Sequence, residues 1–82
     1  MTTGYQITFS DFRQLLSYPD YRPAVAPLIQ SWFGCQVVPT EDGFTLLDAR
    51  GVELSPRAVH DSIQADPDRQ QRIYQTAMSL WR

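Results

Sequence analysis

The sequence predicts an α+β fold with two N-terminal helices, a small antiparallel meander of two to three strands, and two C-terminal helices. Three observations support this prediction. Apolar residues recur at helical spacing in the first and last thirds of the chain. The middle third changes to short β-branched and aromatic runs separated by glycine-bearing turns. Serine or aspartate directly before proline, a typical helix start, occurs twice after residue 54.

The first predicted helix covers residues 9–18. Thr8 and Asp11 have the spacing of a helix-opening capping pair, and Tyr18 ends the helix because it precedes a proline. The apolar positions of this segment are Phe9, Phe12, Leu15 and Leu16. A short strand over Tyr5–Phe9 is the alternative for its beginning.

The second predicted helix follows a proline-rich turn at residues 19–23 and stops at Gly34, where a left-handed residue is expected. Its interior Pro27 removes a backbone donor. The helix is therefore expected to start at Pro27 or to carry an irregular first turn. Five apolar residues share one face, namely Val25, Leu28, Ile29, Trp32 and Phe33.

Three short strands are predicted within residues 35–54, joined by turns that contain Gly43 and Gly51. Pro39 belongs at an edge or a strand end because it cannot donate to a ladder. This segment has a local charge of −3, from Glu41, Asp42, Asp48 and Glu53 against Arg50. Both acidic stretches match turn chemistry better than a metal site.

Two further helices are predicted, from Ser55-Pro56 to about Ala65 and from Asp66-Pro67 almost to the chain end. In the first, Val59 and Ile63 are the strong apolar positions, so it is expected to be half exposed. On the last helix, Asp68 has the spacing to pair with Arg72. Its apolar stripe must be covered by the chain's own sheet or by another subunit and consists of Ile73, Tyr74, Ala77, Leu80 and Trp81.

Composition limits the size and class of the protein. Eighty-two residues suffice for one domain, with a folded surface of about 5,000 Å². A core this small often gains from self-association, so a homodimer is a reasonable expectation. A hydrophobic content of 43% with ten aromatic residues argues against disorder.

The charge pattern argues against two classes of partner. A net charge of −2 gives no basis for tight binding to phosphate backbones, so nucleic acid is not the expected partner. No apolar run or signal peptide is evident, which predicts a cytoplasmic protein without membrane contact. All seven basic residues are arginine. Both a GC-rich, bacterial genome and selection for bidentate guanidinium contacts would produce this bias.

The residues suited to chemistry are Cys35 and His60, each the only one of its type. Cys35 follows a predicted helix C-terminus, where the helix dipole disfavours a thiolate, so a buried and inert thiol is expected. His60 is expected on a solvated helix surface. The sequence predicts no cofactor, no metal site and no catalytic constellation, and it resembles no known family.

The function expected from these observations is a small, non-enzymatic protein–protein interaction or accessory module. Tyrosine, tryptophan and arginine are enriched in the anchoring parts of protein interfaces. A nucleic-acid-binding helical domain with a hairpin wing is one alternative, and a thiol enzyme using Cys35 and His60 is another. The candidate partner-binding residues are Tyr18, Tyr21, Arg22, Arg69, Arg72 and Trp81.

Overall fold

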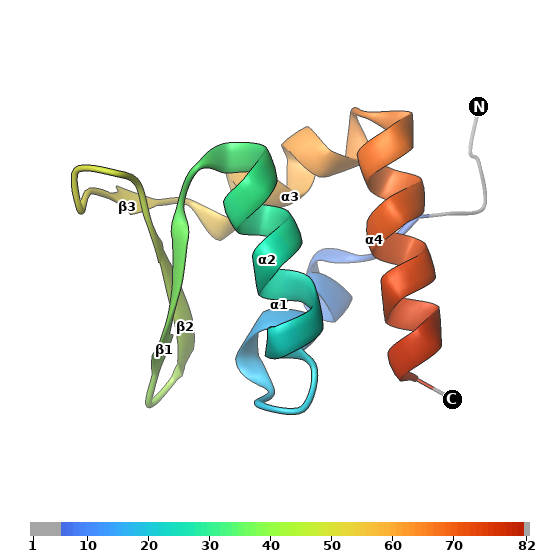
Figure 1. Ribbon diagram of the computed structural model, residues 1–82, viewed down its shortest axis with the longest axis horizontal. Coiled ribbons are helices and arrows are strands. Elements are labelled where there is room, and N and C mark those ends of the chain that lie inside the picture. The colour runs from blue at the N-terminus through green and yellow to red at the C-terminus, as the bar shows by residue number, and fades with distance from the viewer. Residues whose placement is uncertain (1–5, 82) are drawn as a thin grey trace.

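The computed structural model describes residues 6–81 and confirms the predicted α+β order (Figure 1). The strands form one antiparallel sheet in the order β1-β2-β3. In chain order, the elements are α1 (Phe9–Ser17), α2 (Arg22–Phe33), β1 (Gln36–Thr40), β2 (Gly43–Leu47), β3 (Glu53–Leu54), α3 (Pro56–Gln64) and α4 (Pro67–Leu80).

Side-chain caps start three of the helices, as the sequence predicted. The Thr8 hydroxyl accepts a hydrogen bond from the Asp11 amide at 3.1 Å and opens α1. The Ser55 hydroxyl does the same for α3. The Asp66 carboxylate accepts from the first amides of α4. Residues 6–8 precede α1 without forming a strand, and Tyr5 of the alternative strand lies outside the described residues.

Helix α2 begins at Arg22, so of the two expected alternatives the start at Pro27 is wrong. Pro23 occupies the first turn, where a backbone donor is not needed, and Pro27 lies inside the helix. Pro27 leaves the Pro23 carbonyl without its helical donor, but both prolines are exposed, so water can satisfy that group. The helix ends at Gly34, whose φ of 64° is left-handed, as predicted.

The sheet is a hairpin with a short third strand. Strands β1 and β2 pair from Gln36↔Leu47 to Thr40↔Gly43, so Glu41 and Asp42 form the exposed hairpin tip. Pro39 lies on the edge strand β1, as predicted. The hairpin stands at the end of the molecule opposite α4 (Figure 1).

The core lies between the helices and one face of β2. Helix α2 contacts α1, α4 and β1, while α3 contacts α1 and α4. The surface area of 5252 Å² is close to the area expected for a folded chain of this size. The largest fully buried side chains are Phe12, Leu15, Leu16, Val25, Ile29, Leu46, Ile63 and Ile73.

Candidate interaction surface

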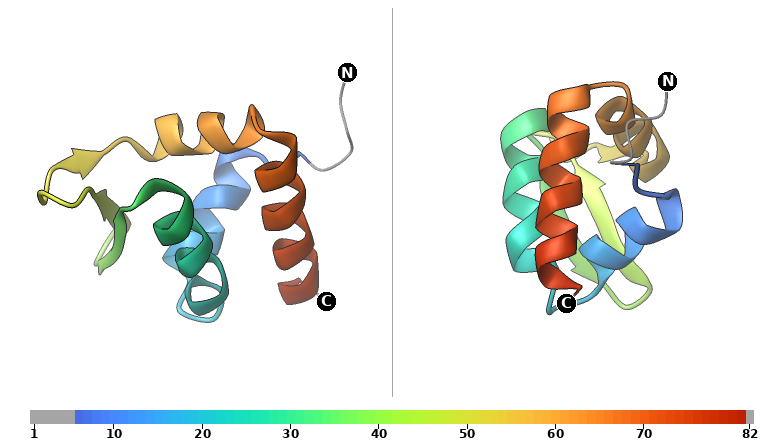
Figure 2. Two further views of the ribbon diagram at one scale, coloured as in Figure 1. Left: turned by 45° about the horizontal axis from the view of Figure 1, so that its top comes forward. Right: turned by 90° about the vertical axis from the view of Figure 1, so that its right-hand side faces the viewer.

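Helices α2 and α4 run side by side (Figure 2), and their side chains line a shallow seam. Two hollows follow this seam, and Arg72 lines both of them. We call the residues that line these hollows the α2–α4 seam. One hollow, of about 370 Å³, is lined by Leu28, Ser31, Trp32, Asp68, Arg69 and Arg72. The other is lined by Ala24, Arg72, Gln75, Thr76, Ser79 and Leu80.

Arg69 is held in place by contacts within the chain. Its guanidinium carbon lies 5.7 Å from the ring centre of Trp32 and 5.2 Å from that of Phe33. Its Nε is 3.6 Å from a carboxylate oxygen of Asp66, which also caps α4. The aromatic rings and the carboxylate therefore fix Arg69 as part of the wall of the seam.

Arg72 and Asp68 differ from Arg69 in having no ionic partner. Both are exposed, and they lie four residues apart on α4. Within residues 6–81 neither side chain forms an ion pair, so the pair suggested by their spacing is not formed. The α2–α4 seam thus presents one cation, Arg72, and one anion, Asp68, along the same hollow, and neither is ion-paired within the described residues.

The three aromatic candidates from the sequence lie together at one end of the helices. The rings of Tyr18 and Tyr21 stack with centres 5.7 Å apart. Tyr21 meets Trp81 edge to face at 6.4 Å. Tyr18 remains 48% exposed. The turn between α1 and α2 therefore provides part of the cover that the terminal tryptophan needs, and it leaves a tyrosine available at the surface.

The Arg22 guanidinium donates hydrogen bonds to main-chain carbonyls at the end of α1. Its Nε donates to the Leu16 carbonyl at 2.8 Å and its Nη2 donates to the Ser17 carbonyl at 2.6 Å. Carbonyls at a helix end lack helical donors, so Arg22 caps the C-terminus of α1. The forked guanidinium thus has a structural role, and we leave Arg22 out of the interaction surface.

Cys35 is buried, as predicted. Its side chain is 2% exposed, and its Sγ lies 4.0 Å from the Ile29 carbonyl oxygen. Burial raises the pKa of the Cys35 thiol above its usual range, because a buried thiolate loses its hydration. The thiol is therefore a poor nucleophile at neutral pH.

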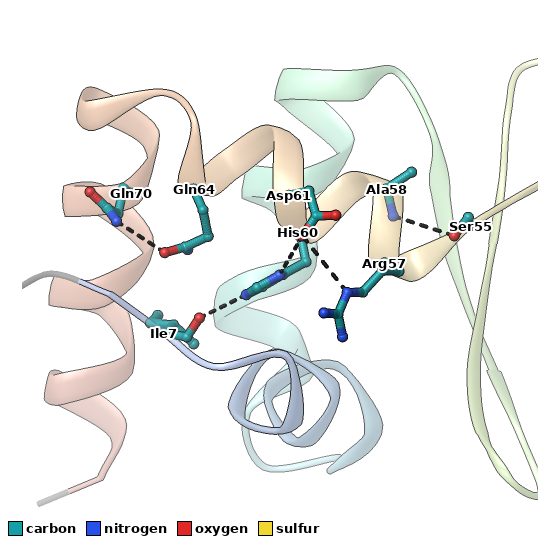
Figure 3. Close-up of polar contacts among 8 residues, drawn as sticks. All are labelled: Ile7, Ser55, Arg57, Ala58, His60, Asp61, Gln64 and Gln70. Carbon is teal, nitrogen blue, oxygen red and sulfur yellow. Dashed lines mark hydrogen bonds and ion pairs between the residues drawn. The ribbon is translucent and has the colours of Figure 1, made fainter. Parts of the chain in front are cut away.

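The prediction for His60 was wrong, because the side chain is buried. Only 8% of the residue is exposed, and the ring packs near Phe9 and Phe12. Its Nε2 lies 2.7 Å from the Ile7 carbonyl oxygen, and Nδ1 faces Asp61 at 3.4 Å (Figure 3). Since a carbonyl only accepts, Nε2 carries the proton and donates it. His60 therefore joins α3 to the segment before α1.

The acidic turn at Asp48 is closed by hydrogen bonds to its own backbone, as expected for turn chemistry. The Asp48 carboxylate accepts from the amides of Arg50 and Val52 at 2.8 and 2.9 Å. Among residues 6–81, no three His, Cys, Asp or Glu side chains gather as a metal ion would require. No helix in that part of the chain is long and apolar enough to cross a bilayer. The acidic hairpin tip would bring negative charge to a nucleic-acid backbone if it acted as a wing.

Comparisons with known proteins give no relative. No family model, no curated protein and no solved structure matches this chain. The structure brings Arg69 and Arg72 into one seam and brings the three aromatic candidates into one cluster.

The sequence interpretation missed three residues of the seam. Leu28 and Trp32 had been assigned to the core stripe of α2, but each is half buried at its edge. The spacing of Asp68 and Arg72 permits an ion pair that the structure does not form within residues 6–81. The five apolar residues of α2 form a stripe that is wider than one neighbouring helix can cover. The width of this stripe is the sequence signal that residues at its edge, such as Leu28 and Trp32, remain partly exposed.

Proposed function

We propose that the protein is a small cytoplasmic, non-enzymatic module that binds a protein partner through the α2–α4 seam. The observation that carries this proposal is the open guanidinium of Arg72, which lies between two hollows and has no ion pair within residues 6–81. An arginine fork can bind a carboxylate by two hydrogen bonds, which is a frequent anchor in protein interfaces.

The surroundings of Arg72 support the same function. Trp32 and Leu28 contribute half-buried apolar surface to the seam, and the pinned Arg69 gives its wall a fixed shape. Tryptophan, arginine and tyrosine are the residue types that dominate interface energetics. Rigid anchors also lose little entropy on binding.

The non-enzymatic part of the proposal rests on the two residues best suited to chemistry. The Cys35 thiol is buried with a raised pKa, and the His60 ring is committed to the Ile7 carbonyl. Their polar atoms face different main-chain carbonyls, so a thiol–imidazole pair would need a rearranged core.

The test is an affinity capture from the native host followed by mass spectrometry, with four variants compared against the parent chain. Arg72→Ala and Tyr18→Ala remove exposed candidate anchors. Arg50→Ala and Val52→Ala are matched controls at the turn before β3, where both residues are exposed. Thermal melts of all five proteins establish that each is folded.

We expect a captured protein, or a second copy of the chain, to be lost with Arg72→Ala and retained with both controls. Truncation of an anchor of this kind typically costs about 2 kcal/mol or more, close to a thirtyfold loss of affinity. If every interaction survives in the folded Arg72→Ala protein, the α2–α4 seam is not the binding surface and the proposal is wrong; a loss with Tyr18→Ala alone has the same meaning.

A further inference from the structure

The unpaired charges of the seam form a pattern that is complementary to itself. Asp68 and Arg72 are one helical turn apart, both exposed, and both line the hollow that also contains Leu28 and Trp32. Arg69, which lines the same hollow, already forms an ion pair with Asp66. The two open charges therefore decide which surface can cover this hollow.

We infer that the seam binds a second copy of the same chain, related by a two-fold axis that crosses the exposed face of α4 midway between Asp68 and Arg72. This inference rests on the proposed function and names its partner. In a two-fold interface the same patch meets itself, so residue i of one copy contacts residue j of the other, and the reverse. Antiparallel α4 helices would then place Asp68 of each copy opposite Arg72 of the other.

The geometry of a helix pair fits this arrangement. Residues four apart are separated by about 6 Å along the axis, and packed helices lie about 8–10 Å apart. A two-fold axis midway between positions 68 and 72 reverses the order of the two charges and preserves their spacing. Both ion pairs are then formed by one rotation, with no further adjustment of the backbone.

The same charges disfavour simpler partners. An acidic segment that reached Arg72 would also meet the Asp68 carboxylate, and a basic segment that reached Asp68 would meet Arg72. Like charges brought together in an interface oppose binding. A partner must therefore present both signs at the spacing of one helical turn, and a second copy of α4 does so by construction.

Apolar surface near the axis supports the same pairing. Leu28 and Trp32 are half buried in the monomer, and they line the hollow beside which the axis passes. Each copy would cover the hollow of the other. Because the seam is shallow and mostly polar at its rim, the expected dimer is weak, with a dissociation constant in the micromolar range.

The test uses charge reversal and sedimentation equilibrium over micromolar to millimolar chain concentrations. Asp68→Arg gives two positive charges and Arg72→Asp gives two negative charges, so each variant alone should dimerise at least about tenfold more weakly. The double variant restores opposite charges in reversed order and should dimerise again. An equal mixture of the two single variants, each carrying a different fluorophore, should form a mixed dimer detected by energy transfer.

Two controls match the change in net charge at a distance from the seam. Arg50→Asp changes the charge by the same amount as Arg72→Asp, and Asp42→Arg matches Asp68→Arg. Both sites are exposed in the turns of the sheet, and both control variants should dimerise like the parent chain. Thermal melts identify any variant that fails to fold, and the mixed dimer and double variant keep the test decisive in that case.

A parent chain that stays monomeric at millimolar concentration overturns the inference, as does a dimer that is indifferent to both Asp68→Arg and Arg72→Asp. If the chain is monomeric but Arg72→Ala still abolishes capture of a different protein, the seam serves another partner and the proposed function stands. If neither dimer nor capture depends on Arg72, both proposals are wrong.

Discussion

Replacement of Arg22 by alanine should destabilise the fold without altering the seam. Arg22 donates from Nε and Nη2 to the carbonyls of Leu16 and Ser17, at 2.8 and 2.6 Å. Hydrogen bonds from a charged donor contribute about 1.5–3 kcal/mol each. Because these bonds are only part-buried, water replaces some of the loss. We therefore expect the free energy of unfolding to fall by about 2–3 kcal/mol in total.

That loss is large for a chain of this size. Stabilities of about 0.05–0.15 kcal/mol per residue give about 4–12 kcal/mol for 82 residues. The midpoint of thermal unfolding should fall by about 10–20 °C, since a small domain loses about 4–8 °C per kcal/mol. Urea titration followed by circular dichroism measures the free energy directly, provided that the slope stays unchanged.

Two further variants make the result interpretable. Arg22→Lys keeps the charge but loses the planar fork that reaches two carbonyls at once, so an intermediate loss is expected. Arg50→Ala removes an exposed arginine and should change stability by less than about 0.5 kcal/mol. If Arg22→Ala is as stable as Arg50→Ala, the helix-capping role is refuted and Arg22 returns to the candidate surface.

Four other predictions concern the core and its junctions. Cys35 should resist alkylation in the native state and react readily in denaturant; rapid native labelling would contradict its burial. Burial raises the pKa of Cys35 in the folded state. Its contribution to the free energy of unfolding is therefore present below the usual thiol pKa of about 8.5 and is lost as the pH rises through the folded-state pKa. Cys35→Ala should flatten the decline of stability in alkali. His60→Leu should lower the free energy of unfolding by about 1–3 kcal/mol, because the Ile7 carbonyl loses its donor, and an unchanged urea midpoint would show that this bond is dispensable. Gly34→Ala should cost about 1–2 kcal/mol because φ is +64°, and a neutral effect in the same titration would mean that the helix end relaxes.

The features predicted correctly are those that depend on near neighbours in the chain. A cap such as Ser55 or Asp66 acts on amides two or three residues ahead, so the signal and the structure lie in one short segment. The left-handed Gly34 is another local signal. The predicted helix end at Gly34, together with the tendency of a free cysteine to be buried, likewise placed Cys35 at the buried junction between α2 and β1.

The features missed depend on contacts between distant segments. His60 and Ile7 are separated by 53 residues, and no local pattern indicates that a histidine on α3 will meet a carbonyl before α1. Pro27 left the start of α2 open between two alternatives, because the loss of its backbone donor is visible in the sequence and the contacts that α2 makes with α1, α4 and β1 are not. The open charges of the seam were missed for a similar reason, since the i, i+4 spacing of Asp68 and Arg72 permits a pair but does not form one.

The use of arginine throughout the chain strengthens the case for Arg72. Of the six arginines within residues 6–81, Arg13 and Arg57 approach the Phe9 ring, Arg69 lies over Trp32 and Phe33, and Arg22 caps α1. These contacts use the planar guanidinium, whatever the origin of the missing lysines. Only the side chains of Arg50 and Arg72 make no such contact in that part of the chain. Arg50 lies on an exposed turn before β3, whereas Arg72 lies between two hollows of the α2–α4 seam. Under the proposed function, an arginine without an ion pair beside two hollows is the group that a partner would engage, so charge reversal at position 72 tests that proposal directly.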